Sequence, residues 1–237
     1  MSKLYIIGTP IGNLNDITLR ALETLKFVDI IACEDTRVTQ KLLNHYSINK
    51  PVITYSKIRE DVAAKNIISL LKSEKNIGVV SDAGMPLISD PGFNIIKIAR
   101  DENIDVEIIP GVSALTTAFS WSALSNKFCF EGFPSEKKNK RQEELKNIIP
   151  DYAYIYFVSP HKIMNFIEDI DLVLGDEADI FLAKELTKIY EQFFSGTAKE
   201  IKKILESKSI KGEFTMVLKL KPKKRIKVNK YENKKNN

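Results

Sequence analysis

The sequence predicts an α/β protein, with a parallel sheet covered by helices on both faces and then a second, smaller α/β segment. In the first half, short apolar runs alternate with amphipathic segments, which is the pattern of such a sheet. Loops that contain Gly and Pro follow several of these runs. The 237 residues are 43% hydrophobic and 28% charged, an ordinary globular composition sufficient for one large domain or two small ones.

The first half contains five expected strands, separated by helices whose apolar residues recur at intervals of three and four. The strands span 4–7, 28–33, 52–55, 77–80 and 106–109. Asp16 is placed to N-cap the first helix, and Asp61 is placed to open the third. The apolar helix positions are Leu19, Leu22 and Leu25, then Leu42, Leu43 and Tyr46, then Ala64, Ile67, Ile68 and Leu71, then Ile95, Ile96 and Ala99.

The second half continues the alternation with longer strands. Expected strands span 128–133, 153–158, 180–183, 190–194 and 214–220. Expected helices run from the basic stretch 137–141 toward Pro150, over 161–174 and around 197–205. The domain boundary falls in the helix and loop around 111–126. We therefore assign 1–112 to an N-terminal domain, 113–220 to a C-terminal domain and 221–237 to a basic, disordered tail.

Positive charge is concentrated at the C-terminal end. Residues 219–237 contain nine Lys or Arg and one acid, so this segment carries +8 and the other 218 residues carry −3. Such a segment favours a polyanionic partner, and a solvated end that aids solubility explains it equally well. No apolar run approaches the ~18 residues of a membrane span, and no signal peptide is recognisable, so we expect a cytoplasmic protein without membrane contact. Two Cys and two His give neither a disulfide framework nor a metal-ligand spacing, so no metal is expected.

Four unusual loops follow the expected strands, at the edge where open α/β sheets bind ligands. They lie within 8–13, 34–37, 81–92 and 110–114. Gly8 and Gly12 are four residues apart and no Lys follows Gly12, which disfavours both the dinucleotide fingerprint and the P-loop. An ordinary β–α turn explains each loop alone. Four such loops at one edge favour a binding site.

These loops carry a family resemblance. Residues 4–14, Leu-Tyr-Ile-Ile-Gly-Thr-Pro-Ile-Gly-Asn-Leu, resemble the opening of the ribosomal RNA small-subunit methyltransferase I family, in the tetrapyrrole methylase (class III) superfamily. Further similar stretches, in the same order, are 16–18, 20–22, 34–37, 81–84, 90–92, 110–111, 130–133, 183–188 and 211–213. The sequence departs from the family at Met85, where Thr is usual, at Val112 and Val158, where Pro and Glu are usual, and at 56–60, where histidines are usual.

The resemblance implies a two-domain tetrapyrrole methylase-like fold with a mixed sheet in the C-terminal domain. It also implies S-adenosylmethionine bound in the cleft between the domains, and a homodimer. The implied reaction is methyl transfer to the ribose 2′-hydroxyl of a cytidine in the decoding region of small-subunit (16S) ribosomal RNA. The residues expected to bind the cofactor are Pro10, Asp82, Met85, Ser113, Ala114, Phe157, Leu186 and Thr215.

A ribose hydroxyl is a poor acid, so such a reaction benefits from a general base or from a cation near the developing alkoxide. Two charged clusters supply the candidate catalytic residues, which are Asp35, Arg37, Lys184 and Glu185. Contacts to the RNA substrate are expected from Glu34, Thr36, Lys137, Lys138, Lys140, Arg141 and Lys188. A structural ion-pair network is the alternative interpretation of the clusters. Two other functions stay open: methylation of a tetrapyrrole or other small molecule, and ribosome binding without catalysis.

Overall fold

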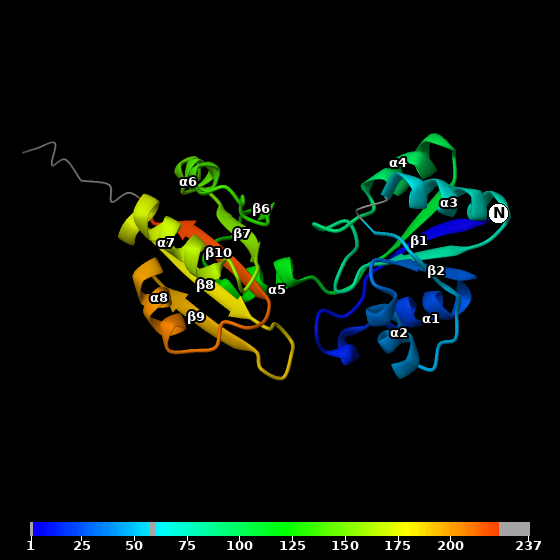
Figure 1. The fold of residues 1–237 in the computed structure, drawn as a ribbon, viewed down its shortest axis with the longest axis horizontal. Helices are drawn as coiled ribbons and strands as arrows, with labels where there is room; N and C mark the ends of the chain where they lie inside the picture. The colour runs from blue at the N-terminus through cyan, green and yellow to red at the C-terminus, as the bar shows by residue number, and fades with distance from the viewer. Residues whose placement is uncertain (1, 57–59, 223–237) are drawn as a thin grey trace, which may run out of the picture.

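The computed structural model describes residues 2–56 and 60–222, and it contains two α/β units that lie end to end (Figure 1). Each unit is built on a five-stranded sheet. The strands of one sheet all precede residue 110, and those of the other all follow residue 127. The two sheets therefore lie on opposite sides of the domain boundary predicted at residue 112.

The N-terminal unit alternates strands and helices. Its strands are β1 (Lys3–Ile7), β2 (Ile30–Cys33), β3 (Val52–Thr54), β4 (Ile77–Val80) and β5 (Asp105–Ile109). Its helical elements are η1 (Leu14–Asp16), α1 (Leu19–Phe27), α2 (Thr36–His45), α3 (Glu60–Lys72) and α4 (Phe93–Asp101). All strands are parallel, in the order β3-β2-β4-β1-β5, so their carboxyl ends share one edge.

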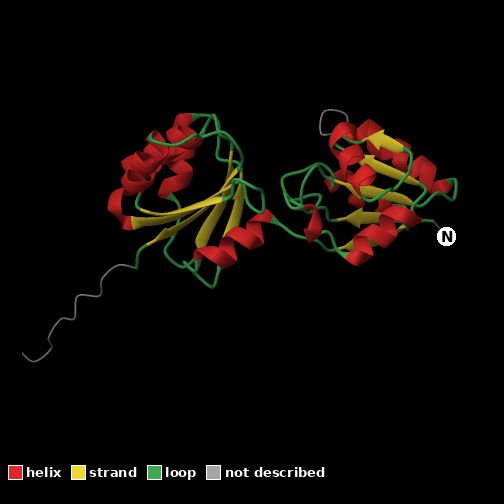
Figure 2. Cartoon of the chain, turned by 90° about the horizontal axis from the view of Figure 1, so that it is seen from below, coloured by secondary structure: helices red, strands yellow, loops and turns green. Residues whose placement is uncertain are grey.

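Alternate residues of this sheet face two separate cores. Ile67 of α3 and Ile95 of α4 pack on one face, and Leu25 of α1 and Leu43 of α2 pack on the other. Each of these side chains is at most 1% exposed, and burying one of this size contributes about 1.5–3 kcal/mol. Figure 2 shows helices on both sides of the sheet. The predicted parallel sheet with helices on both faces is confirmed.

The C-terminal unit has a mixed sheet, as predicted. Its elements are α5 (Ala114–Ser122), β6 (Phe128–Gly132), α6 (Lys138–Lys146), β7 (Ala153–Val158), α7 (Ile163–Leu174), η3 (Gly175–Glu177), β8 (Ala178–Lys184), β9 (Gln192–Gly196), α8 (Ala198–Glu206) and β10 (Phe214–Leu220). The strand order is β6-β7-β10-β8-β9, and within it β6 and β7 are parallel while the other pairs are antiparallel. Apolar residues of α6, α7 and α8 cover one face, and α5 lies on the other.

One helix begins where the sequence did not place it. Asp16 lies in the turn η1, and the cap of α1 is Thr18, whose hydroxyl accepts the Ala21 N–H at 3.1 Å. Asp61 lies in the first turn of the described part of α3. Within the described part of the chain, no helix has the length and apolar character needed to cross a membrane. The basic tail from residue 223 onward lies outside the described residues.

Candidate active site

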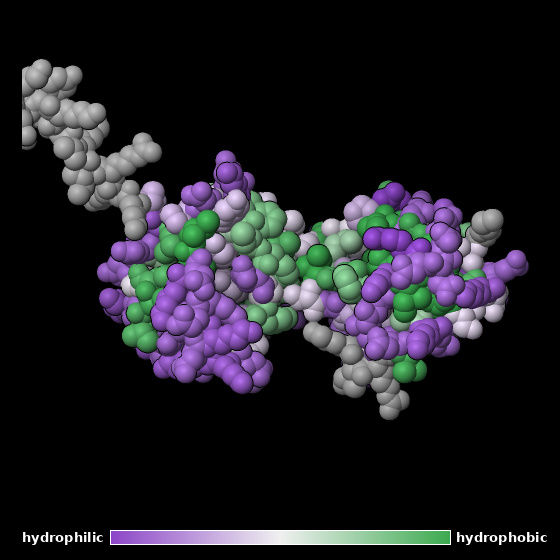
Figure 3. All heavy atoms as spheres, turned by 90° about the horizontal axis from the view of Figure 1, so that it is seen from above, coloured by the Kyte–Doolittle hydropathy of each residue, from purple (hydrophilic) through white to green (hydrophobic). Residues whose placement is uncertain are grey.

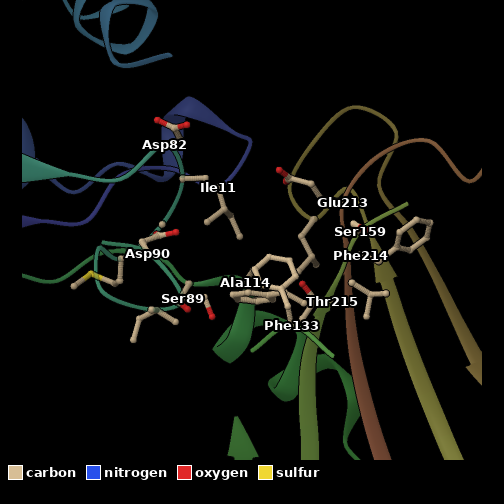
Figure 4. Close-up of a pocket in the computed structure, with 18 of the residues that line it drawn as sticks. Ile11, Asp82, Ser89, Asp90, Ala114, Phe133, Ser159, Glu213, Phe214 and Thr215 are labelled. Carbon is tan, nitrogen blue, oxygen red and sulfur yellow. The ribbon is translucent and has the colours of Figure 1, made fainter. Parts of the chain in front are cut away.

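A pocket of about 380 Å³ lies between the two units, within the range of about 300–1,000 Å³ typical of small-molecule sites (Figure 4). It is lined by Ile11, Asp82, Ala83, Gly84, Met85, Ile88, Ser89, Asp90, Ser113, Ala114, Phe133, Phe157, Val158, Ser159, Pro160, Leu186, Glu213, Phe214 and Thr215. Three of these described lining residues are carboxylates, and none is Lys, Arg or His. The pocket therefore suits a ligand with an apolar part and a positive charge.

A second, larger cavity of about 630 Å³ lies beside α6, α7 and α8. Its lining residues carry both signs of charge and are paired with one another, as in the contacts of Lys202 with Glu168 and of Lys162 with Glu136. It lies on the helix-covered side of the C-terminal sheet, away from the carboxyl edge of the parallel sheet. The pocket between the units is therefore the candidate site.

Backbone contacts join the loops after β1, β4 and β5 into one surface. The Thr9 N–H donates to the Gly84 carbonyl at 2.9 Å, and the Gly84 N–H donates to the Thr9 carbonyl at 3.1 Å. A Cβ on Gly8 would lie 2.7 Å from both the Gly111 nitrogen and the Met85 sulfur. Because the backbones of these two loops approach so closely, Gly8 after β1 and Gly111 after β5 cannot be replaced by a larger residue unless neighbouring atoms shift.

The loop after β1 also contacts the C-terminal unit. The Asn13 N–H donates to Thr187 Oγ1 at 3.0 Å. A Cβ on Gly12 would lie 2.5 Å from Lys188 Cγ. The first loop is therefore in direct contact with the loop after β8, and the two units meet at the pocket.

The loop after β8 is strained and held by ion pairs. Glu185 and Thr187 have φ values of 53° and 63°, and such backbone costs of the order of 1–3 kcal/mol per residue. Lys188 Nζ lies 2.9 Å from Glu185 and 2.8 Å from Glu213. Burial opposes the charge on Lys188, but its bonds to both carboxylates raise its pKa overall. The ion pairs thus fix Leu186 in the pocket wall.

The carboxylate of Asp82, at the end of β4, is linked to the N-terminus of α2. Its Oδ1 accepts the Asp35 N–H at 3.0 Å, and burial raises the pKa of Asp82. Asp35 caps α2 and accepts hydrogen bonds from the Arg37 N–H at 2.8 Å and from Arg37 Nη2 at 2.6 Å. These bonds lower the pKa of Asp35 to about 2 and raise the pKa of Arg37. The pair therefore stays ionised at neutral pH.

Seven of the eight residues expected to bind a cofactor line the pocket, and they come from both units. These seven are Asp82, Met85, Ser113, Ala114, Phe157, Leu186 and Thr215. Pro10 is buried and is not among the lining residues, whereas its neighbour Ile11 is. The Gly111 N–H donates to the Met85 sulfur at 3.2 Å, so this thioether forms part of the pocket floor.

Burial argues against the expected catalytic role of Lys184. Successive residues of β8 point to opposite faces, and Ala183 belongs to the core on the α5 side. Lys184 therefore points to the helix-covered side, where it is 6% exposed and its Nζ donates to the Ser209 carbonyl. It does not line the pocket. Its position is that of a structural residue in the core.

Burial also argues against the expected role of Arg141 in RNA binding. Arg141 is 8% exposed, and its Nε donates to Asp169 Oδ2 at 2.7 Å. A guanidinium buried against a carboxylate is not available to a phosphate. Lys137, Lys138 and Lys140, by contrast, are exposed around the start of α6.

The remaining charged candidates lie near the pocket without lining it. Glu34, Asp35, Thr36 and Arg37 occupy the end of β2 and the first turn of α2, beside Asp82. The Arg37 side chain is 86% exposed. Glu185 and Lys188 lie in the loop that holds Leu186. Both clusters are therefore placed around the pocket, on different units.

Several lining residues were not predicted as site residues. They are Ile88, Ser89, Asp90, Phe133, Ser159, Pro160, Glu213 and Phe214. A signal was present for five of them. Ile88, Ser89 and Asp90 lie in the expected ligand loop 81–92, and Phe133 and Glu213 lie in stretches that carry the family resemblance. Ser159 and Pro160 follow β7, so their position at a strand end was the only other indication.

The pocket combines apolar side chains with carboxylates, and it lies at strand ends between two α/β units. This arrangement indicates an α/β protein that binds a small molecule between its units. A profile of the family "Tetrapyrrole (Corrin/Porphyrin) Methylases" matches residues 3–202. Proteins named "Ribosomal RNA small subunit methyltransferase I" are 51% identical in Mycoplasmopsis pulmonis, over 92% of this chain and 97% of the relative, and 45% identical in Thermotoga maritima, over 92% and 98%. The chain belongs to the tetrapyrrole methylase family and, within it, to the ribosomal RNA small subunit methyltransferase I group.

Solved structures share the fold at low sequence identity. A diphthine synthase matches with a TM-score of 0.70 and 17% identity, over 92% of this chain and 90% of its own. The uroporphyrin-III C-methyltransferase of Thermus thermophilus, in complex with S-adenyl homocysteine, matches with a TM-score of 0.65 and 13% identity, over 91% and 97%. At these identities the likeness establishes the fold alone.

Proposed function

We propose that this chain transfers the methyl group of S-adenosylmethionine to the ribose 2′-hydroxyl of a cytidine in the decoding region of small-subunit ribosomal RNA. The observation that carries the proposal is the pocket between the units, with three carboxylates and no basic side chain among its described lining residues. The 51% identity to a relative named as a ribosomal RNA methyltransferase supports the choice of substrate.

The lining residues fit S-adenosylmethionine. When bound, this cofactor supplies an electrophilic methyl group on a positively charged sulfur. Phe157 and Leu186 offer an apolar wall to an adenine ring, and Asp82 offers an acceptor to a ribose hydroxyl or an ammonium group. The backbone at Gly84, with φ of 80°, carries no side chain that would block close approach.

The charge of the pocket also favours S-adenosylmethionine over the two other ligands considered, a tetrapyrrole and a phosphate-rich cofactor. An acidic macrocycle would bring its carboxylates toward Asp82, and like charges in a concave site repel. A phosphate-rich cofactor meets the same repulsion. A cationic sulfonium is attracted. The tetrapyrrole alternative is therefore disfavoured by this chain's own residues.

The protein's contribution to the reaction is alignment and charge. Displacement at a methyl group is in line, so holding the hydroxyl and the methyl at near contact supplies much of the rate enhancement. The low pKa of Asp35, about 2, makes it a weak base at neutral pH. Burial opposes the charge on Glu185, but the Glu213 N–H and Lys188 lower its pKa overall. In this proposal Arg37, which remains protonated, stabilises a developing alkoxide or an adjacent phosphate of the RNA.

Polyanionic RNA would meet exposed cations on both units. Arg37 lies on the N-terminal unit, and Lys137, Lys138 and Lys140 lie at the start of α6 on the C-terminal unit. Each phosphate contact adds salt-dependent affinity. The proposed substrate places the protein in the cytoplasm, with the ribosome.

A homodimer is part of the proposal. Exposed apolar residues lie on the α5 side of the C-terminal sheet, including Trp121 at 63% and Phe128 at 40% exposed. Figure 3 shows a hydrophobic band on the C-terminal unit where it faces the N-terminal unit. Exposed apolar side chains of this kind are typical of subunit interfaces. Light scattering should give twice the chain mass, Trp121→Lys should reduce it, and Leu19→Lys, at another 79% exposed position, should not.

The decisive experiment uses the full chain, labelled S-adenosylmethionine and small ribosomal subunits from a strain that lacks the gene. After digestion of the RNA, label should appear in 2′-O-methylcytidine. Label in another nucleoside would keep the enzyme class and change the target. Cofactor binding without any transfer to the subunit would contradict the ribosomal assignment. Subunit binding without methyl transfer to any RNA would support the non-catalytic alternative.

A further inference from the structure

The rim of the pocket carries an exposed aromatic ring that the proposed cofactor contacts leave unused. Phe133 is 61% exposed, yet it lines the pocket and lies edge-on to Phe157, with ring centroids 6.0 Å apart. Phe157 in turn meets Phe130 at 5.0 Å. The rings are therefore in contact in the order Phe130, Phe157, Phe133, and part of the Phe133 ring is exposed to solvent.

The backbone before Phe133 is shaped to present this ring. The pairing of β6 with β7 shifts register between Phe130 and Gly132, and such bulges redirect a side chain next to a site. Gly132 has a φ of 70°, and a Cβ there would lie 3.1 Å from Ser89 Oγ of the N-terminal unit. The following Pro134 is buried. Phe133 is thus held between fixed neighbours although its ring is exposed.

The inner wall of the pocket and its rim differ in solvent exposure. Thr215 and Leu186 are 5% and 7% exposed, against 61% for Phe133. A small cofactor needs the enclosed part of the pocket. A polymer that approaches from solvent meets the rim first. In Figure 4, Phe133 lies between Ser89 and Thr215, at the space where the two units face each other.

Cations follow Phe133 closely along the chain. Lys137 lies four residues later, and Lys138 and Lys140 begin α6, all exposed. The Cα atoms of Phe133 and Lys137 are therefore at most ~14 Å apart, and Lys138 and Lys140 follow in the first turn of α6. An exposed aromatic ring beside lysines is the combination that holds unstacked nucleobases, because every base has a π-face and every nucleotide a phosphate.

We infer that Phe133 is the stacking platform for an unstacked nucleobase of the RNA substrate, at or beside the methylated nucleotide. The lysines at the start of α6 then hold the adjoining phosphates. This inference rests on the proposed function and assigns a substrate subsite within it. Phe133 is a positioning residue in this scheme, since it holds the base and does not touch the reacting hydroxyl.

The test compares Phe133→Ala, Phe133→Leu and Phe133→Trp in the full-length protein. The measurements are the Kd for S-adenosylmethionine by calorimetry, and KM and kcat for small subunits at fixed salt. The Ala and Leu variants should raise KM by about 5- to 150-fold, and Trp should stay within about threefold of the native protein. The cofactor Kd should be unchanged in all three. Phe93→Ala, at a 73% exposed position on α4, is the matched control and should leave KM unchanged.

Three outcomes would overturn the inference. If Phe133→Leu matches the native protein, the ring is only an apolar rim. If the cofactor Kd rises as much as KM does, Phe133 belongs to the cofactor wall. If kcat falls with KM unchanged, the ring does not hold the base in the bound substrate. Failure of the native protein to methylate RNA would instead refute the proposed function itself, so the two failures are distinct.

Discussion

Replacing Arg141 with Met is expected to destabilise the C-terminal unit by about 3–5 kcal/mol, because the change leaves a buried charge without its partner. Arg141 is 8% exposed and Asp169 is 2% exposed. The guanidinium also donates to the carbonyls of Ser135 at 3.0 Å and Glu136 at 3.2 Å. One side chain therefore satisfies three acceptors beneath α6.

The magnitude depends on what remains around Asp169. In Arg141→Met, the carboxylate keeps the Gln142 Nε2 donor at 2.6 Å and loses its charge partner. The double variant Arg141→Met with Asp169→Leu removes both charges. It should recover most of the lost stability, because replacing a whole buried pair by apolar residues is often neutral or stabilising.

The assay is urea unfolding followed by the fluorescence of Trp121, the single tryptophan of the chain. It lies in α5, so it reports on the C-terminal unit. Lys140→Met, one residue away and exposed, is the control and should change the unfolding free energy by less than about 0.5 kcal/mol. The reasoning is refuted if Arg141→Met unfolds like the native protein but loses RNA affinity, since that is the behaviour of a phosphate contact.

Three further predictions concern the site. Asp82→Asn should weaken cofactor binding as measured by calorimetry. In the native protein the cofactor affinity should fall as pH drops through the pKa of Asp82, which burial raises above its usual value. The Asp82→Asn variant should lack this pH dependence. Gly8→Ala should lose about 1–3 kcal/mol of unfolding free energy together with cofactor binding, whereas Gly175→Ala, with no atom within 4 Å of its new Cβ, should lose stability without affecting binding. Arg37→Ala should lower kcat about 100-fold with folding unchanged, whereas Lys184→Met should lower stability by about 1.5–3 kcal/mol and leave turnover per folded molecule unchanged. A loss of turnover in Lys184→Met that exceeds its loss of folded protein would restore Lys184 as a catalytic residue.

The N-terminal sheet was predictable because its signals are local. Each strand is a short apolar run, each helix has an apolar stripe, and the parallel order follows from their alternation. Three of the four loops at the shared edge were recognisable from their Gly and Pro residues, and the fourth, 34–37, from its cluster of charged residues. Gly8 and Gly111 are 103 positions apart in sequence, and nothing local indicates that a Cβ on Gly8 would clash with the nitrogen of Gly111 at 2.7 Å. The sequence predicted which loops meet at this edge, and the packing of the structure gives the reason for two of their glycines.

The two assignments that burial argues against, Arg141 and Lys184, have a common physical cause. Arg141 lies in a run of basic residues, and Lys184 lies in a charged cluster at the end of a strand. The local sequence therefore predicts for each of them the same role as for the charged residues beside it. One residue along a strand reverses the face, and one along a helix turns the side chain by about 100°. Asp169, the partner of Arg141, is on another helix, α7. Burial of a charge is decided by such distant partners, which a local pattern does not contain.

Negative and positive side chains occupy different places relative to the pocket, and each sign matches one of the two proposed ligands. Asp82 lines the interior, where a positively charged sulfur would be held, while Arg37 and the lysines of α6 lie outside it. A cation inside the pocket would repel the cofactor, and a carboxylate cluster outside it would repel RNA. Asp35 joins the two zones, because its N–H donates to Asp82 and its carboxylate holds Arg37. The same residue thus places an acceptor for the cofactor and a cation for the substrate at a fixed separation, which is what an in-line transfer between the two requires.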